Sequence, residues 1–252
     1  MKILEKVLTV FLLAPLGLYA QVDKYEDTPE FLAPQVDIYK SSTPILTHYF
    51  KLIKADGSSE ILDRQNSNVP VKPASTMKIF TGWWAFSTDV REHDYLATML
   101  KTSSNAMAQS TLDLMGSPHD MELYYEGLGL DVNENSLRVA DGSGLSYSNQ
   151  ANCDIQIELL EYIYNSADFE TFRELMAKPG EEGTLVNRLK NLKGKVFAKT
   201  GTLRATAALS GFVDSPKGTI IFCVLSDFIR TSLPTERARI DALVTKNYNL
   251  AQ

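Results

Sequence analysis

Three short motifs that could do chemistry together occur in a fixed order along the chain. They are Ser75-Thr76-Met77-Lys78, Ser103-Ser104-Asn105 and Lys199-Thr200-Gly201. A serine hydroxyl is a poor nucleophile until a positioned base removes its proton. On a helix, the spacing from Ser75 to Lys78 puts the hydroxyl and the amine on one face, within reach of each other. A lysine can be that base only if burial or a nearby cation, such as Lys199, lowers its pKa. The three motifs therefore predict nucleophilic catalysis by Ser75.

Each motif also has an ordinary structural explanation. Serine and asparagine are good helix N-caps, so Ser75, Ser103 and Asn105 could serve as caps without any chemistry. Lys78 would then be a solvated surface lysine, and the third motif would be the end of a strand. Each motif is common alone, but the three in this order are rare, and this favours the catalytic interpretation. A helix that begins at Ser75 would also offer a backbone N–H group to a developing oxyanion.

These residues resemble the class C low-molecular-mass penicillin-binding proteins, the penicillin-binding protein 4 type of D-alanyl-D-alanine carboxypeptidase and endopeptidase. The resemblance covers about residues 47 to 226 and includes three further runs: Asp141-Gly142-Ser143-Gly144-Leu145-Ser146, Gly183-Thr184-Leu185 and Leu209-Ser210-Gly211. It implies an α+β fold of the serine β-lactamase and D,D-peptidase type. In this fold an antiparallel sheet of about five strands is flanked by helices, here with a minimal helical subdomain.

The resemblance also implies a role for each motif residue in cleaving a peptide that ends in D-Ala-D-Ala. Ser75 would attack the carbonyl of the penultimate D-alanine, and Lys78 would take its proton. Ser103 would relay a proton to the leaving amine, while Asn105 would hold Lys78 and a substrate carbonyl. Lys199 would supply positive potential. The substrate-binding residues would be Thr200, Gly201 and Thr202: Thr200 binds the terminal carboxylate, and the backbone N–H groups of Thr202 and Ser75 form the oxyanion hole.

The partners that this resemblance implies are peptidoglycan peptides, with β-lactam antibiotics as covalent inhibitors and no cofactor. One departure from the family is large, because Ser103 follows Ser75 by only 28 positions. The family usually inserts extra domains between these two motifs, so the inserts are expected to be absent. A more open site could admit crosslinked peptides and favour endopeptidase activity, although the sequence does not decide between carboxypeptidase and endopeptidase.

Two other functions remain open on the same motifs. A β-lactamase or esterase would share Ser75, Lys78 and Lys199, but class A β-lactamases use a dedicated glutamate for deacylation. No convincing Glu-x-x-x-Asn loop lies between Asn105 and Lys199. A non-catalytic sensor of β-lactams or stem peptides would need an output module, and the sequence suggests none. The Asp141-Gly142-Ser143-Gly144 run could either brace the site or contact the substrate.

The elements that must position these motifs follow from local patterns. Alternation predicts a hairpin from strands at 47–53 and 60–63, and three consecutive strands at 195–199, 205–213 and 219–226. Apolar periodicity predicts helices over 75–86, 105–114, 121–126, 155–164, 169–176, 184–192 and 234–246. The two groups of strands, at the two ends of this region, should meet in one antiparallel sheet with helices on its faces.

The N-terminal residues predict export. Lys2 and Lys6 precede an apolar run at 7–18 that is short for a bilayer, which is typical of a signal peptide cleaved after Ala20. Residues 21–252 would then form a single periplasmic or secreted domain, with an extended arm at 21–45 and no stable membrane anchor.

The charge of the chain and its few histidines and cysteines bear on which partners and ligands it can have. The formal charge of −6 and the absence of a basic stripe argue against nucleic acid. The three histidines are scattered, so no metal site is predicted. Cys153 and Cys223 could pair in an oxidising compartment, but two buried free thiols are the slightly favoured expectation.

Overall fold

The computed structural model describes residues 43–252, which form one unit built around a five-stranded antiparallel sheet. The strands lie in the order β2-β1-β7-β6-β5. Their bounds are β1 (Ile45–Lys54), β2 (Ser59–Gln65), β5 (Val196–Leu203), β6 (Thr206–Ser215) and β7 (Gly218–Asp227). Strand β1 pairs along its whole length with β7, so the two groups of strands predicted from the sequence do meet in one sheet. Two short strands, β3 (Leu137–Arg138) and β4 (Gln150–Ala151), form a separate pair.

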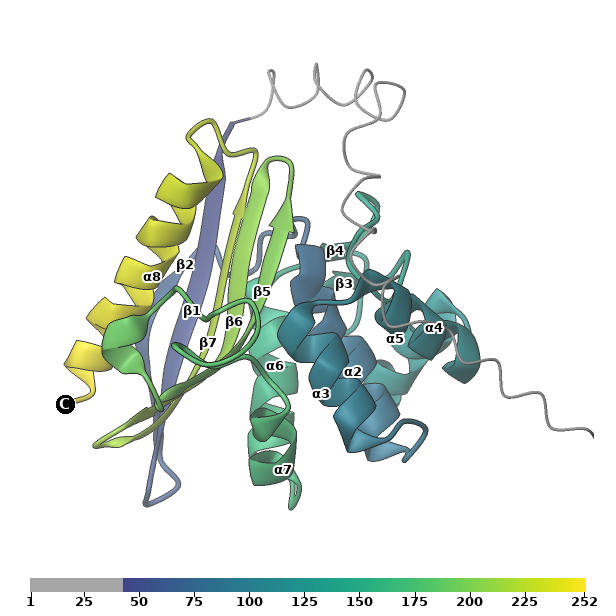
Figure 1. Cartoon of the computed structure of the whole chain (residues 1–252), viewed down its shortest axis with the longest axis horizontal. Helices are drawn as coiled ribbons and strands as arrows, with labels where there is room; N and C mark the ends of the chain where they lie inside the picture. The colour runs from purple at the N-terminus through teal and green to yellow at the C-terminus, as the bar shows by residue number, and fades with distance from the viewer. Residues whose placement is uncertain (1–42) are drawn as a thin grey trace, which may run out of the picture. The chain divides into compact units, whose positions relative to one another are not determined.

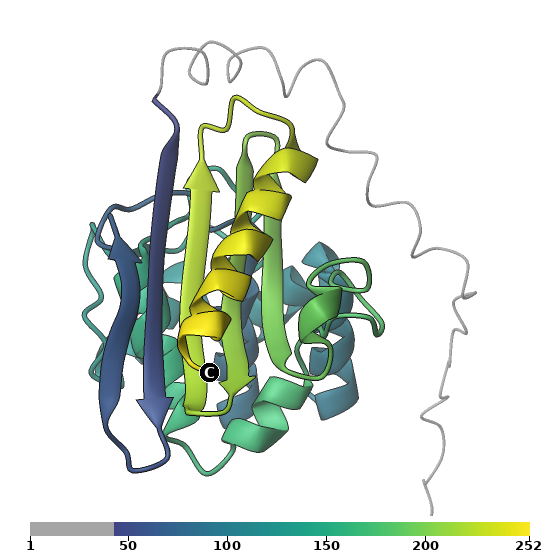
Figure 2. The same ribbon diagram turned by 90° about the vertical axis from the view of Figure 1, so that its left-hand side faces the viewer.

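Helix α8 (Leu233–Leu250) lies across one face of the sheet, as Figures 1 and 2 show. It begins with Ser232 as N-cap, and Pro234, the second helical residue, suits the first turn because its missing N–H would be unsatisfied there anyway. Apolar residues of the strands, such as Leu209 and Val224, pack against Ile240 and Val244 of α8. This layer makes one of the two hydrophobic clusters formed by residues 43–252.

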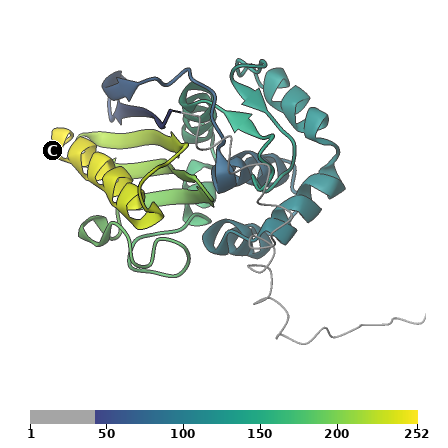
Figure 3. The same ribbon diagram turned by 90° about the horizontal axis from the view of Figure 1, so that it is seen from above.

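The opposite face of the sheet carries the other helices, which gather on the far side from α8 when the molecule is seen from above (Figure 3). Phe212, Cys223 and Leu225 of the sheet belong to the same hydrophobic cluster as Trp83 and Phe172 of this layer. The helices are α2 (Met77–Ser87), α3 (His93–Thr102), α4 (Asn105–Met115), α5 (Pro118–Gly127), α6 (Cys153–Tyr164) and α7 (Phe169–Glu174). Among the described residues, no helix is long and apolar enough to cross a membrane.

The α+β fold with a five-stranded antiparallel sheet is confirmed, but one predicted helix is absent and one helix was missed. Residues 184–192 are not a helix, since only the 3-10 turn η3 (Lys190–Leu192) forms there. Gly183 and Leu189 both have positive φ, which interrupts a right-handed helix, yet Leu185 and Leu189 still bury their side chains in the α8 cluster. Helix α3 was not predicted, because only Leu96, Met99 and Leu100 mark its buried stripe.

The two cysteines are paired, contrary to the expectation of free thiols. Cys153 at the start of α6 and Cys223 on β7 form a disulfide, with their Cα atoms 5.5 Å apart. The expectation failed because both residues lie in apolar surroundings, which suit a buried thiol and a buried disulfide equally well. The predicted signal peptide at 1–20 and most of the arm at 21–45 lie outside the described residues, and Ile45 already belongs to β1.

Candidate active site

Ser75 lies in a 3-10 turn that leads directly into helix α2. The turn, η2 (Ala74–Thr76), follows Pro73, and the regular α-helix starts only at Met77. The sequence had predicted that the α-helix begins at Ser75 itself. Ala74 has a φ of +49°, so the backbone turns sharply just before the serine. The Thr76 hydroxyl donates to the carbonyl of Pro73 at 2.8 Å and closes this turn.

A buried hydrogen-bond chain fixes the turn to the sheet. Gln156 of α6 is 1% exposed, and its Nε2 donates to Thr76 Oγ1 at 3.2 Å. Its Oε1 accepts a bond from the Ser210 hydroxyl on β6 at 2.6 Å. Buried polar groups of this kind are costly to leave unpaired, so the chain holds the serine turn in one position relative to α6 and the sheet. Sequence reasoning did not single out Gln156, whose partners lie on elements distant in the chain.

Lys78 is completely buried, with three oxygen atoms around its amine. Its Nζ lies 2.9 Å from Ser75 Oγ, 2.7 Å from Asn105 Oδ1 and 2.6 Å from the carbonyl oxygen of Ser143. Burial lowers the pKa of Lys78 to about 7, although the charge of Asp141 acts in the opposite direction. The interpretation of Lys78 as a solvated surface lysine is therefore wrong.

The second motif lies between two helices, and its central residue does the capping. Ser104 is the N-cap of α4 and accepts a hydrogen bond from the Met107 N–H at 3.3 Å. This leaves Asn105 as the first residue of α4, with its side chain directed at Lys78. Ser103 has a left-handed φ of +63° at the end of α3. Among residues 43–252, no hydrogen-bond partner is found for the Ser103 hydroxyl.

The third motif lies on β5, the edge strand of the sheet next to the serine turn. Lys199 is completely buried, and its Nζ donates to the carbonyl of Thr200 at 2.9 Å. Burial, together with the positive charge of Lys78, holds the pKa of Lys199 well below its usual value. A Cβ on Gly201 would lie only 2.9 Å from the Pro73 carbonyl oxygen, so this glycine lets β5 approach the turn. Thr200 and Thr202 project to the other face of the strand from Lys199, because side chains alternate along a strand.

The loop after β3 supplies a site group that lies outside the three catalytic motifs. The Asp141 carboxylate accepts four backbone N–H bonds, from Ser143, Gly144, Leu145 and Ser146. These bonds fix the loop so that the carbonyl of Ser143 points at the Lys78 amine. The structure thus favours the bracing role for this loop. The backbone carbonyl could not be found from residue types, since every residue carries one.

The run from Gly183 to Leu185 packs against the end of helix α3, just before the second motif. The N–H of Thr184 donates to the carbonyl of Lys101 at 3.0 Å, in the last turn of α3. Gly183 has a φ of +90°, and a Cβ there would lie 2.5 Å from the same carbonyl oxygen. The glycine is therefore required by both its backbone conformation and the close approach. This run positions the Ser103 loop.

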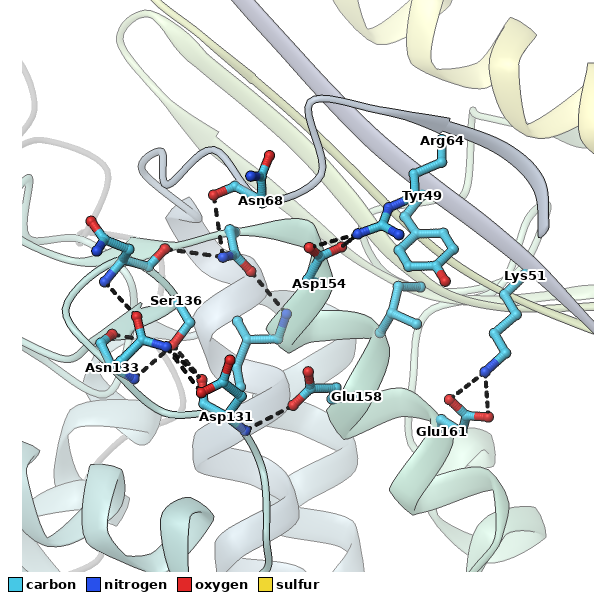
Figure 4. Close-up of a pocket in the computed structure, with 14 residues that line it drawn as sticks. Tyr49, Lys51, Arg64, Asn68, Asp131, Asn133, Ser136, Asp154, Glu158 and Glu161 are labelled. Carbon is cyan, nitrogen blue, oxygen red and sulfur yellow. Dashed lines mark hydrogen bonds and ion pairs between the residues drawn. The ribbon is translucent and has the colours of Figure 1, made fainter.

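A separate polar pocket of about 430 Å³ lies at the β2–β1 edge of the sheet, the opposite edge from β5 (Figure 4). Its charged groups are largely paired with one another. Lys51 binds both oxygens of Glu161, and Arg64 binds both oxygens of Asp154. Glu161 and Asn165 have the Glu-x-x-x-Asn spacing of a deacylation loop. However, Glu161 is part of α6 and its carboxylate is bound to Lys51, so it does not serve the Ser75 site.

The structure brings Ser75 and Asn105 into contact with Lys78 and places the Lys199 strand beside the serine turn. Within the described part of the chain, no group of three or more His, Cys, Asp or Glu residues could hold a metal ion. A buried amine of lowered pKa next to a serine hydroxyl can act as a general base for nucleophilic attack. This geometry is available only because segments far apart in the sequence meet at one end of α2.

The fold is shared with solved penicillin-binding and β-lactamase structures. Penicillin binding protein 4 from Haemophilus influenzae is 24% identical, with a TM-score of 0.53, over 62% of this chain and 39% of that chain. A penicillin G-acylated predatory endopeptidase from Bdellovibrio bacteriovorus, in complex with an immunity protein, is 13% identical, with a TM-score of 0.71. It is matched over 83% of this chain and 93% of its own. A β-lactamase from Chitinophaga pinensis is 16% identical, with a TM-score of 0.65, over 86% of this chain and 97% of its own.

Similarity in sequence points to D-alanyl-D-alanine carboxypeptidases. The enzyme of that name from Actinomadura sp. is 35% identical over 158 residues, which are 56% of this chain and 29% of the relative. D-alanyl-D-alanine carboxypeptidase DacB from Haemophilus influenzae is 29% identical over 139 residues, 50% of this chain and 29% of the relative. The chain thus matches less than a third of the length of these relatives. The family model for D-Ala-D-Ala carboxypeptidase 3 (S13) matches residues 92–247, and the chain belongs to this family.

Proposed function

We propose that this chain is a serine D,D-peptidase that cleaves peptidoglycan stem peptides through a Ser75 acyl-enzyme and is inhibited by penicillin. The observation that carries the proposal is the environment of Lys78. A neutral amine has two N–H donors and one lone pair. The two donors match Asn105 Oδ1 and the Ser143 carbonyl, which leaves the lone pair facing the Ser75 hydroxyl at 2.9 Å. The lowered pKa makes this neutral form accessible near pH 7.

In the proposed reaction, Ser75 Oγ attacks the carbonyl carbon of the penultimate D-alanine and its proton moves to Lys78 Nζ. The backbone N–H groups of Ser75 and Thr202 stabilise the oxyanion that forms. The C–N bond then breaks, and the leaving amine of the last residue receives a proton through Ser103, whose hydroxyl has no other partner in residues 43–252. Water hydrolyses the ester and regenerates the serine. Thr200 and Thr202 hold the substrate. Lys199 contributes positive potential in its protonated form, which is favoured when the neighbouring Lys78 is neutral.

The place of action that we propose is the periplasm or the extracellular space. The Cys153–Cys223 disulfide supports this, because disulfides persist mainly in oxidising compartments. The short separation of Ser75 and Ser103 supports a site open enough for crosslinked peptides. We therefore propose endopeptidase activity besides carboxypeptidase activity. Turnover of crosslinked and uncrosslinked muropeptides can be compared directly, and exclusive cleavage of the free pentapeptide would contradict the open-site proposal.

Digestion of purified sacculi by the wild-type protein and by Ser75→Ala tests the proposed function. Chromatography of the products should show shortened stem peptides, fewer crosslinked dimers, or both with the wild type, and neither with the variant. Fluorescent penicillin should label the wild type at Ser75 and be released slowly. Fast turnover of the penicillin would instead indicate a β-lactamase, and labelling without any release of D-alanine would indicate a sensor.

A further inference from the structure

Arg237 reaches from helix α8 to the strand that carries the third motif. Its Nη2 donates a hydrogen bond to Thr202 Oγ1 at 2.9 Å. A guanidinium group can only donate, so the threonine oxygen is the acceptor. The hydroxyl proton of Thr202 is then left for a different acceptor, and none is found for it among the described residues. Arg237 thus limits the directions in which Thr202 can donate, since the hydroxyl proton must point away from the guanidinium.

The positive charge of Arg237 is also unbalanced, unlike that of its neighbours. Arg188 binds Asp241 through both Nε and Nη2, at 3.2 and 2.6 Å, and Arg239 pairs with Glu236 at 3.3 Å. Within residues 43–252, Arg237 forms no such ion pair. Burial and the charge of Arg188 lower the pKa of Arg237, with Asp241 opposing them, but a guanidinium remains charged in proteins. A half-buried cation beside a free hydroxyl donor is suited to an anion with oxygen acceptors.

We infer that Arg237 is a positioning residue for the free carboxylate on the leaving residue of the substrate. It directs the Thr202 hydroxyl toward that carboxylate and supplies the opposite charge behind it. This inference rests on the proposed function and deepens it, since it adds a residue of α8 to the groups that recognise the terminal carboxylate of the substrate. The same peptide with this carboxylate converted to an amide is then a poor substrate, because an amide brings no negative charge to the Arg237 side of β5.

The test compares two substrates in three variants. The substrates are a diacyl tripeptide that ends in D-Ala-D-Ala and its C-terminal carboxamide, with D-alanine or D-alaninamide release followed by chromatography. Arg237→Gln is expected to raise KM for the carboxylate substrate about tenfold, with kcat little changed and the amide unaffected. Arg237→Lys should recover part of the loss, because it keeps the charge but not the planar fork.

Arg239→Gln is the matched control, since Arg239 lies on the same helix but binds Glu236.

Two results would overturn the inference: an unchanged KM for the carboxylate substrate in Arg237→Gln, or an equal loss for both substrates. Binding can also be compared without catalysis. Calorimetry measures the dissociation constants of the two peptides for the Ser75→Ala protein and for the same protein that also carries Arg237→Gln. A wild type that releases no D-alanine would contradict the proposed function. The role of Arg237 would still be supported if the Ser75→Ala protein binds the carboxylate peptide more tightly than the amide and loses this difference with Arg237→Gln.

Discussion

The amine of Lys78 can satisfy its three oxygen neighbours in either protonation state. As an ammonium it has three donors for Ser75, Asn105 and the Ser143 carbonyl, and as a neutral amine it has two donors and accepts from Ser75. Proton uptake from the serine therefore requires no rearrangement of the site. The cost of burying the charged form is what lowers the pKa, and no carboxylate of residues 43–252 contacts the amine directly to offset it.

The reactivity of Ser75 should rise with pH through the titration of Lys78. Below about pH 7 the amine is protonated and cannot accept the serine proton, and above that pH it can. The rate constant for acylation by a fluorescent penicillin, measured between about pH 5 and pH 9, should therefore rise with a midpoint near 7. A rate that is constant from pH 6 to pH 8 would contradict this role.

Lys78→Arg supplies the control for this prediction. Arginine keeps a positive charge but does not give up its proton, so acylation should fall by about 10²-fold or more. Thermal unfolding should be measured on the same sample, because a larger side chain in a fully buried position also changes stability. A folded variant that keeps acylation within tenfold of the wild type would show that Lys78 is not the base.

At the scale of elements, the site depends on close approaches between backbones that glycine permits. A Cβ on Gly144 would lie 1.8 Å from the carbonyl oxygen of Ala74, in the turn that carries Ser75. The Asp141 loop and the serine turn therefore fit together only because position 144 has no side chain. Gly201 plays the same part between β5 and Pro73.

Gly144→Ala should be far more damaging than Gly57→Ala, which is its matched control. Both glycines have a φ of +81°, but nothing lies within 4 Å of a Cβ built on Gly57. The Gly57 variant should lose about 1 kcal/mol from backbone strain alone. The Gly144 variant adds a steric clash and should lose several kcal/mol in urea unfolding, with slower acylation of Ser75. Equal losses of stability in the two variants would contradict the required close approach.

At the scale of the whole molecule, the sheet and the helical layer are joined by packing and by one covalent bond. The disulfide links the start of α6 to β7 across a separation of 70 residues. Gln156, three residues along α6 from Cys153, connects the serine turn to β6. The bond thus anchors the helix that also holds the serine turn in place.

Removal of the disulfide by Cys153→Ala with Cys223→Ala should lower the free energy of unfolding by about 2–4 kcal/mol, since the unfolded chain gains freedom in a long loop. Denaturant unfolding with and without reductant measures the effect. The reductant should destabilise the wild type and leave the double variant unchanged. Two free thiols in the denatured wild type, without reductant, would show that the bond is absent.

The sequence by itself determined the features that depend on near neighbours. Local patterns predicted the contact of Ser75 with Lys78, the hairpin of β1 and β2, and the consecutive strands β5, β6 and β7. They could do so because helical spacing, hydrophobic alternation and turns act over a few residues. The order of the three motifs also predicted the fold through its resemblance to a family. Local patterns failed at 184–192, where positive φ values break the apparent helix.

Only the tertiary structure decided which distant groups meet. It brought the Ser143 carbonyl to Lys78 across 65 positions, paired the two cysteines, and placed Arg237 against Thr202. Backbone carbonyls carry no signal in residue type, and an arginine on an amphipathic helix looks like a solvated residue until the sheet beneath it is known. Such contacts depend on how whole layers pack, and packing is set by many residues together rather than by any short run of sequence.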